Sequence, residues 1–398
     1  MCPSYQATRD ENNTTRARAN ILREYITQSK KENPFDQKEI YDVLDLCLSC
    51  KACKSECPSS VDMAKLKAEA MQHYYDANGI PFRTRMIAYI SYINQIGSVV
   101  PAITNFFLSN SFFSGILKKM LGFAPKRTIP LLYKFTLKAW LKKNVKAGNN
   151  PDHHFKGKLF LFVDEFTDYN DTLIGIKAVK LLQKLGYEVA IPKHKISGRA
   201  FMSKGLLRKA QKLAIDNVEL LKDIVSRETP LVGIEPSAIL SFRDEYPDLV
   251  GDGLKQEAIQ LGKSALMIDE FIAREIDNGK ITARSFTDEA QKIKLHGHCQ
   301  QKSIASTSPT KKMLSLPLNY EVEEIPSGCC GMAGSFGYEK EHYDLSMKVG
   351  ELVLFPEVRK VGGEVIISAP GTSCRHQIHD GAKRDALHPL EVLYNALK

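Results

Sequence analysis

Apolar residues recur at helical spacing in the first part of the chain. They do so over residues 19–26 and 40–46, and a longer helix is expected over residues 63–78. Asp62 precedes that helix as an N-cap, and Gly79 follows it as a stop signal. These patterns predict a small helical domain. So small a domain buries little apolar surface, and a bound group would add the stability that it lacks.

From residue 158 onward the pattern changes to strands that alternate with helices. An amphipathic run at 174–185 predicts a helix that ends at Gly186, and further helical segments are expected over 206–214 and 218–225. The expected strands cover residues 159–163, 187–191, 231–234, 292–295, 320–322 and 364–367. Strands alternating with helices imply parallel sheets, so we predict an α/β architecture for this part.

The last three of these strands repeat the first three. Tyr187-Glu-Val189 matches Tyr320-Glu-Val322 at an offset of 133 residues, and the same offset carries Gly198 onto Gly331. A repeat of this kind predicts two related α/β halves.

The expected fold class is therefore α plus α/β, because 398 residues are too many for one ordinary domain. We predict a helical domain over residues 1–85 and a helical, basic connecting segment over 86–157. The first α/β half is expected over 158–290, and the second over 291–398.

The net charge of +9 is concentrated in the connecting segment. Between Leu117 and Lys158 there are eleven Lys and Arg residues and one acid, Asp152. The rest of the chain is near neutral, so no nucleic-acid partner is expected.

Residues 86–117 contain no charged side chain. Gly97, Pro101 and Gly115 interrupt this stretch, and several polar residues dilute it, so no membrane-spanning helix is predicted. The favoured interpretation is a helical linker packed across the neighbouring domains. The alternative is a peripheral contact, in which this uncharged piece and its basic neighbour lie on an anionic membrane surface.

The cysteines supply the candidate chemistry. Four of them lie within eleven residues, as C-x2-C-x2-C-x3-C followed by Pro58: Cys47, Cys50, Cys53 and Cys57. This spacing is typical of a [4Fe–4S] cluster, and in the two-cluster pattern the last cysteine ligates another cluster. Cys2, in its own Cys-Pro pair, is therefore the expected fourth ligand beside the first three. Zinc is the alternative, although its cysteine pairs are usually separated by a dozen residues or more.

The compartment follows from the same residues. Nine cysteines in tight clusters indicate metal ligation in a reducing environment, and the N-terminus shows no apolar run typical of a signal peptide. We expect a cytoplasmic protein, or one that is peripheral to the inner face of the membrane.

Four further cysteines follow predicted strands of the second half: Cys299, Cys329, Cys330 and Cys374. Loops after parallel strands converge on one edge of a sheet, so these thiols are expected to meet and to bind a metal or a cluster. His298 and His376 are candidate additional ligands. At the repeat offset the first half has Phe166 and residues 196–198 instead, and Leu240 lies opposite Cys374 after a one-residue shift, so the first half has no thiols at these places.

Two simpler interpretations of these four cysteines stay open. Buried cysteines can act as small apolar residues, and the neighbouring Cys329 and Cys330 can be redox-active as thiols. Three other histidines, His342, His379 and His388, are expected to be polar surface or capping groups.

The cysteine motifs and the residues around them resemble those of a known group of proteins. Residues 1–5, 8–11, 15–20 and 47–58 resemble the ferredoxin-like part of iron–sulfur proteins joined to flavin-linked oxidases. Cys-Cys-Gly at 329–331, with Cys299 before it and Cys374 after it, resembles the cysteine-rich domain pair of the same group. The group includes iron–sulfur components of glycolate oxidase and of anaerobic glycerol-3-phosphate dehydrogenase, the heterodisulfide reductase B subunit, and fused flavin dehydrogenases of D-2-hydroxy acids such as D-lactate or D-2-hydroxyglutarate.

The resemblance implies an electron-transfer portion that works with a flavin enzyme. Its FAD would lie on a missing domain or a partner subunit, because no flavin-binding region is recognisable in this sequence, and a quinone or another carrier would accept the electrons. Two departures from the group matter. Members have further cysteines upstream of the Cys-Pro pair, which leaves Cys57 without partners here and suggests a fragment or a separate subunit. Gln377 also replaces the last cysteine of the fullest motif, which argues against a noncubane cluster.

The sequence is therefore compatible with two functions. The first is electron transfer from FAD through a [4Fe–4S] cluster, whose potential Lys51 and Lys54 would raise. The second is a thiol-based or zinc-bearing reductase or structural module centred on Cys329 and Cys330.

Overall fold

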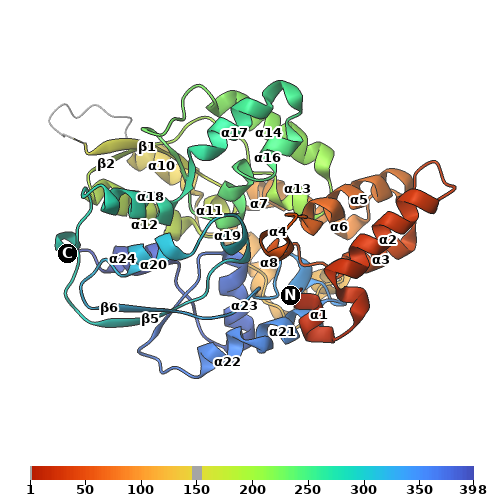
Figure 1. Ribbon diagram of the computed structural model, residues 1–398. Coiled ribbons are helices and arrows are strands. Elements are labelled where there is room, and N and C mark those ends of the chain that lie inside the picture. Colours follow the sequence, from red (N-terminus) through yellow and green to blue (C-terminus); the bar gives the residue numbers. More distant parts are fainter. Residues whose placement is uncertain (1, 146–154) are drawn as a thin grey trace.

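The computed structural model describes residues 2–145 and 155–398 (Figure 1). Met1 lies outside the described residues, as do residues 146–154 of the predicted connecting segment.

The N-terminal part is helical, as predicted. Its helices are α1 (Pro3–Thr8), α2 (Thr15–Gln28), α3 (Lys38–Asp45), α4 (Ala52–Glu56) and α5 (Met63–Asn78). The Asp62 side chain caps α5 by accepting hydrogen bonds from the amides of Ala64 and Lys65, and Gly79 ends it. The cysteine run occupies the loop after α3 and the short helix α4.

Five further helices connect this part to the sheets. They are α6 (Phe82–Ala88), α7 (Ile90–Gly97), α8 (Pro101–Ser109), α9 (Ser111–Leu121) and α10 (Leu137–Asn144). Among the described residues, no helix combines the length and the apolar character needed to cross a membrane.

A four-stranded parallel sheet forms the next part, with strand order β2-β1-β3-β4. Its strands are β1 (Gly157–Phe162), β2 (Tyr187–Ala190), β3 (Leu231–Gly233) and β4 (Ala265–Met267). Its longer helices are α12 (Thr172–Lys184), α14 (Leu207–Leu221), α17 (Lys255–Lys263) and α18 (Ile268–Asp277). Shorter helices follow strands or lie between them: α11 (Glu165–Tyr169), α13 (Arg199–Ser203), α15 (Pro236–Ile239) and α16 (Tyr246–Leu249).

A three-stranded parallel sheet follows, with strand order β6-β5-β7. Its strands are β5 (Gln291–Leu295), β6 (Tyr320–Glu324) and β7 (Ile366–Ser368). Its helices are α19 (Cys299–Ile304), α20 (Ser308–Leu314), α21 (Tyr343–Leu352), α22 (Leu354–Arg359), α23 (Thr372–Ala382) and α24 (Pro389–Asn395).

The two sheets repeat one arrangement, as the sequence predicts. In each, the first strand lies between the second and the third, and Tyr187 and Tyr320 occupy matching positions, paired with Gly157 and Gln291. The predicted parallel α/β architecture is confirmed. The exact domain boundaries stay predictions.

Two details differ from the sequence-based expectation. Strand β4 was not predicted, and α14 is one continuous helix where two segments were expected. Both differences lie away from the cysteines.

One hydrophobic core joins the two sheets. Leu159 and Leu161 of β1 belong to the same buried cluster as Ile293 and Leu295 of β5. Because the halves share a core, the loops at their strand ends are held in fixed relation to each other.

Candidate functional site

The N-terminal cysteines converge from three short elements. Cys2 precedes α1, Cys47 and Cys50 lie in the loop after α3, and Cys53 lies in α4. Ser49 and Lys51 have positive φ angles of 50° and 62°, so the backbone turns sharply on either side of Cys50. All nine cysteines are free thiols, so none is withdrawn from ligation by a disulfide.

The charges of these thiols act on one another. Burial raises the pKa of Cys50, and the neighbouring charges of Cys47 and Cys2 raise it further. Burial also raises the pKa of Cys53, and Cys47 adds to that shift. Cys50 and Cys53 therefore resist losing their protons, and a positively charged iron core would stabilise them as thiolates.

Arg18 is a buried cation at this site. Its side chain is 1% exposed, its Nη1 group donates a hydrogen bond to Cys2 Sγ at 3.1 Å, and its Nη2 group has no partner. Burial raises the pKa of Cys2, but the charge and the hydrogen bond of Arg18 outweigh burial and lower it. Among the described residues no carboxylate pairs with Arg18, so the anionic partner that it lacks fits a thiolate-bound cluster.

Cys57 stands apart from the other four thiols of this region. It follows α4, and its pKa is lowered by the backbone amides of Val61, Ser59 and Ser60 rather than by any cysteine charge. This placement agrees with a separate role for Cys57, which stays a prediction.

Lys51 and Lys54, expected to raise the cluster potential, face carboxylates instead. The Lys51 Nζ lies 2.5 Å from Asp244 and 3.1 Å from Glu245, and its side chain is 1% exposed. Lys54 also pairs with Asp244. The charge of Lys51 is therefore offset by acids of the first α/β half, and this pairing attaches the cysteine loop to that half.

The second group of cysteines lies at the strand ends of the second half. Cys299 begins α19, Cys329 and Cys330 follow β6, and Cys374 lies in the first turn of α23. Gly331 has a φ of +94°, and a Cβ there would lie 2.3 Å from the carbonyl oxygen of Ser346. Only glycine allows the backbone this approach next to the vicinal cysteines.

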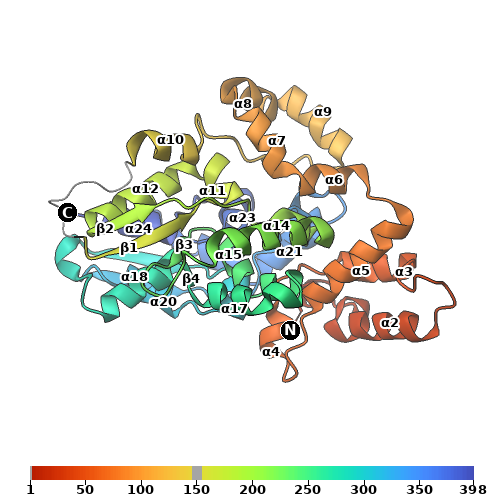
Figure 2. The same cartoon turned by 90° about the horizontal axis from the view of Figure 1, so that it is seen from above.

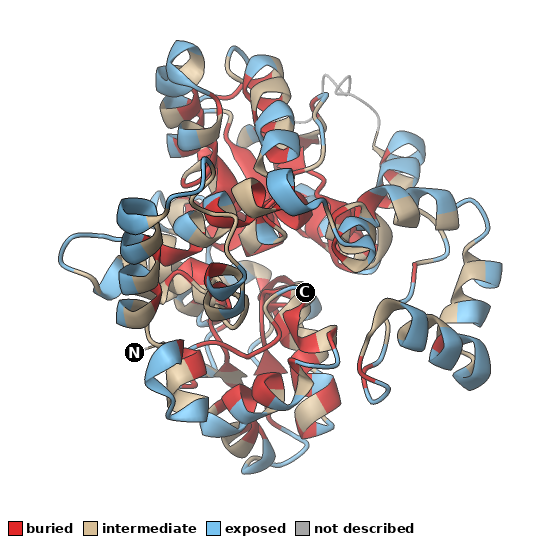
Figure 3. Ribbon diagram, turned by 90° about the vertical axis from the view of Figure 1, so that its right-hand side faces the viewer, coloured by how far each residue is buried: buried red, intermediate tan, exposed pale blue. Residues whose placement is uncertain are grey.

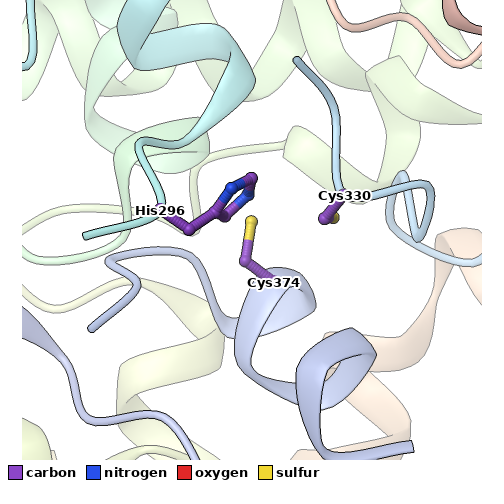
Figure 4. Close-up of side chains that lie close together, drawn as sticks. All are labelled: His296, Cys330 and Cys374. Carbon is purple, nitrogen blue, oxygen red and sulfur yellow. The ribbon is translucent and has the colours of Figure 1, made fainter. Parts of the chain in front are cut away.

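His296 joins this group, which the sequence analysis missed. Ligand atoms of His296, Cys330 and Cys374 all lie within 4.8 Å of one another, and the imidazole points toward the two thiols (Figure 4). Hydrogen bonds from Cys329 and Cys374 lower the pKa of Cys330, and His296 lowers it further. Burial lowers the pKa of His296, so the ring is a neutral nitrogen donor.

Cys299 is linked to the others through Cys329. A hydrogen bond from Cys329 lowers the pKa of Cys299 to about 7, with a further contribution from His298. A thiol with that pKa is present as a thiolate to a substantial extent near neutral pH, and the thiolate is the form that binds metals or reacts.

Several buried polar atoms around these thiols have no hydrogen-bond partner: His296 Nε2, His298 Nδ1, Ser368 Oγ and Gln377 Oε1. An unsatisfied buried polar atom costs about 1–3 kcal/mol, so such a concentration needs an explanation. Nδ1 of His296 meets Ser327 Oγ at 2.7 Å, which leaves Nε2 free for a ligand. The donor set fits a metal ion with sulfur and nitrogen ligands.

The two cysteine groups are neighbours. Helix α4 packs on α19, and Ser303 Oγ donates hydrogen bonds to the carbonyl oxygens of Cys50 (3.3 Å) and Cys299 (3.0 Å). The charge of Cys299 also adds to burial in raising the pKa of Cys50. Both residues border the same buried cluster as Cys329. The N-terminal cysteines therefore contact the edge of the second half at which the other thiols meet.

The other histidines considered as ligands or capping groups lie in different environments. His298 lies beside Cys374, since a Cβ at Gly371 would meet both side chains. The pKa of His376 is lowered by burial and shifted by charged groups rather than by a cysteine, so the structure does not bring it to the site. His388 caps α24, as expected, and His379 is exposed and meets Asp385.

For His342 the expectation of a surface or capping group was wrong. Its side chain is buried, it stacks on Phe336, and it lies 2.7 Å from Asp45 and 3.3 Å from Glu339. Burial lowers the pKa of this histidine, but the two acids outweigh burial and raise it to about 9. A charged His342 thus joins the N-terminal helices to the second half.

Comparison with known proteins adds to this geometry. Residues 1–61 match the family described as 4Fe-4S dicluster domain. D-2-hydroxyglutarate dehydrogenase of Pantoea ananatis is 23% identical over 437 residues, which cover 99% of this chain and 41% of that protein. The Escherichia coli K12 protein of the same name is also 23% identical, over 100% of this chain and 42% of its own length.

Shorter relatives match as well. The C subunit of anaerobic glycerol-3-phosphate dehydrogenase from Escherichia coli K12 is 26% identical, over 85% of this chain and 83% of that protein. Lactate utilization protein A of Bacillus subtilis is 28% identical, over 53% of this chain and 87% of that protein.

These comparisons confirm the predicted resemblance and the predicted class, an iron–sulfur electron-transfer module related to dehydrogenases. The chain spans about two fifths of the length of the D-2-hydroxyglutarate dehydrogenases that it matches.

Proposed function

We propose that the chain is the iron–sulfur portion of a flavin-dependent 2-hydroxy-acid dehydrogenase, of the D-lactate, glycolate or D-2-hydroxyglutarate type. A [4Fe–4S] cluster held by Cys2, Cys47, Cys50 and Cys53 would accept and release one electron at a time. The observation that carries this proposal is the meeting of these cysteines beside Arg18, a buried cation with an unsatisfied donor.

The chain's own residues hold and protect the site. The positive φ angles of Ser49 and Lys51 turn the backbone on either side of Cys50. The positively charged Arg18 donates a hydrogen bond to the sulfur of Cys2. The Lys51 ion pairs fix the loop on the first α/β half, and burial of Cys50 restricts the access of water. A fixed, water-poor setting reduces the reorganisation that accompanies electron transfer.

The electron donor would be FAD on another domain or a partner subunit. Oxidation of a 2-hydroxy acid to the 2-oxo acid releases two electrons and two protons, which a flavin takes together and passes on singly. The acceptor would be a quinone or another carrier. If the acceptor is a quinone, this protein would have to reach the membrane surface from the cytoplasmic side.

The second site would bind a metal ion or a cluster through Cys299, Cys329, Cys330 and Cys374. The nitrogen donor of His296 favours zinc there, since structural zinc sites combine sulfur and nitrogen ligands. This is also the basis of the second candidate function, a zinc-bearing or thiol-based module.

Metal analysis of two variants separates these roles. Cys330→Ser is expected to lose the metal of the second site and to keep the N-terminal iron. Ser197→Ala, at the corresponding place in the first half, should lose neither. If Cys330→Ser keeps every metal of the wild type, the second site is not a metal site.

Anaerobic reconstitution with iron and sulfide tests the main proposal. After reduction by photoreduced flavin, the full chain should show the low-temperature EPR signal of a reduced [4Fe–4S] cluster. Absence of that signal, with dithionite as well as with flavin, would overturn the proposal.

A further inference from the structure

Helices α8 and α9 carry many large apolar side chains that are exposed in the described molecule. No residue of α8 is buried, and in α9 only Ser114 is. Large apolar side chains are exposed in these helices and in the residues from the end of α7 to α8: Ile96, Val99, Val100, Ile103, Phe106, Phe107, Phe112, Phe113, Ile116 and Met120. We call this set the apolar face. Figure 3 shows the corresponding helices at the right-hand edge as largely pale blue and tan.

Four phenylalanines form the centre of the apolar face. Phe107 and Phe113 have ring centroids 4.9 Å apart, and Phe112 lies 5.4 Å from Phe113. Phe112 is 68% exposed and Phe106 is 54% exposed. The rings contact one another and still present their outer sides to solvent. Exposed apolar patches of this kind mark interaction sites.

The electrostatic character of this region is one-sided. The sequence has no acidic residue between Asp76 and Asp152, Lys118 and Lys119 lie beside Met120 at the end of the apolar face, and Lys126 follows it. Protein interfaces are depleted in lysine, whereas segments that lie on membranes combine Phe and Leu with Lys and Arg. The charge pattern therefore favours an anionic lipid surface over a protein partner.

The position of the apolar face agrees with this partner. In Figure 2, α8 and α9 lie at one side of the molecule and α4, which carries Cys53 of the cysteine run, lies at the opposite side. A flavin partner has to approach the cysteines, which leaves α8 and α9 free for a different contact.

The length of the helices limits the mode of contact. The nine residues of α8 span roughly 14 Å, about half of a bilayer's hydrocarbon core of about 30 Å. Such a helix lies in the interface and does not cross it.

We infer that α8 and α9 bind the surface of an anionic lipid membrane, with the phenylalanines in the acyl boundary and the lysines at the headgroups. This contact fits the proposed transfer to a quinone. The apolar face and its charge are observed independently of that proposal, so the two can fail separately.

Vesicle co-sedimentation of the full chain tests the inference. The protein should bind vesicles that contain phosphatidylglycerol, bind much less to pure phosphatidylcholine, and lose binding as salt rises. Phe112→Glu should weaken binding about tenfold or more, and Lys119→Glu several-fold.

Leu318→Glu is the matched control. Leu318 is 72% exposed and lies in the second α/β half, so its substitution should leave vesicle binding unchanged. Melting temperature and iron content, measured on every variant, report folding and the cluster separately.

Two results would overturn the inference. One is absence of wild-type binding to anionic vesicles; the other is an equal loss for Phe112→Glu and Leu318→Glu. A flavin-containing protein that the wild type captures and Phe112→Glu does not, without any vesicle binding, would assign the apolar face to that protein.

Discussion

The two α/β halves share one strand order but use the same edge of their sheets differently. At the repeat offset, Glu165 and Ser197 of the first half correspond to His298 and Cys330 of the second. Ser197 Oγ donates a hydrogen bond to Glu165 at 2.7 Å, so this pair satisfies itself. In the second half, buried nitrogen and oxygen atoms around the thiols, including those of His296 and His298, have no hydrogen-bond partner. A duplicated edge can therefore become scaffold in one copy and keep a ligand site in the other.

Both halves also hold the N-terminal helices, again by different means. The first half supplies the buried acids Asp244 and Glu245, which Lys51 and Arg199 neutralise. The second half supplies the single charged imidazole of His342 between Asp45 and Glu339. Variants of these contacts test the two attachments separately.

The largest effect is expected from Lys51→Met. Its removal leaves the buried carboxylates of Asp244 and Glu245 short of positive charge, which typically costs about 3–5 kcal/mol. Chemical denaturation should show a destabilised protein, and iron content should fall with it. The matched control is Lys38→Met, because Lys38 forms a solvent-exposed pair with Asp42 that contributes little to stability. Equal effects of both variants would contradict a structural role for the buried network.

A smaller, pH-dependent effect is expected at His342. Its folded pKa of about 9 lies above the unfolded value, so its stabilisation is complete below about pH 6.5 and is lost as pH rises through 9. The wild type should lose about 2–3 kcal/mol between pH 7 and 10, since one pKa unit corresponds to about 1.4 kcal/mol. His342→Gln should lack that slope in denaturation curves measured over the same range. A slope that survives in the variant would assign the pH dependence to other groups.

The smallest of these effects is expected at Arg18, which neither half contacts through an ion pair. Its charge favours the more negative, reduced state of a cluster, so Arg18→Gln should lower the reduction potential. The expected shift is on the order of 60 mV, the one-electron equivalent of about 1.4 kcal/mol. Arg18→Lys, which keeps the charge, should shift it less in an EPR-monitored redox titration. Unchanged potentials in both variants would show that Arg18 serves folding alone.

The sequence predicted most of the strands because they are short apolar runs bounded by turns. Strand β4 was not predicted because none of its residues, Ala265, Leu266 and Met267, is β-branched. It is also an edge strand that pairs only with β3. The cysteines were identified by spacing and by the convergence of strand ends.

Side-chain partners at long range were not predictable in the same way. Nothing local distinguishes His296 from His298; the choice depends on Ser327, 31 residues away, which occupies Nδ1 of His296. Arg18 lies inside a recognisable motif, but its role follows from its burial beside Cys2. His342 was misjudged because its acidic partner Asp45 is 297 residues distant.

The iron content of two cysteine variants decides whether Cys2 completes a cluster with Cys47, Cys50 and Cys53. After anaerobic reconstitution, Cys2→Ser should lose most of the N-terminal iron and its EPR signal, whereas Cys57→Ser should keep both. Retention by Cys2→Ser together with loss by Cys57→Ser would contradict this ligand set.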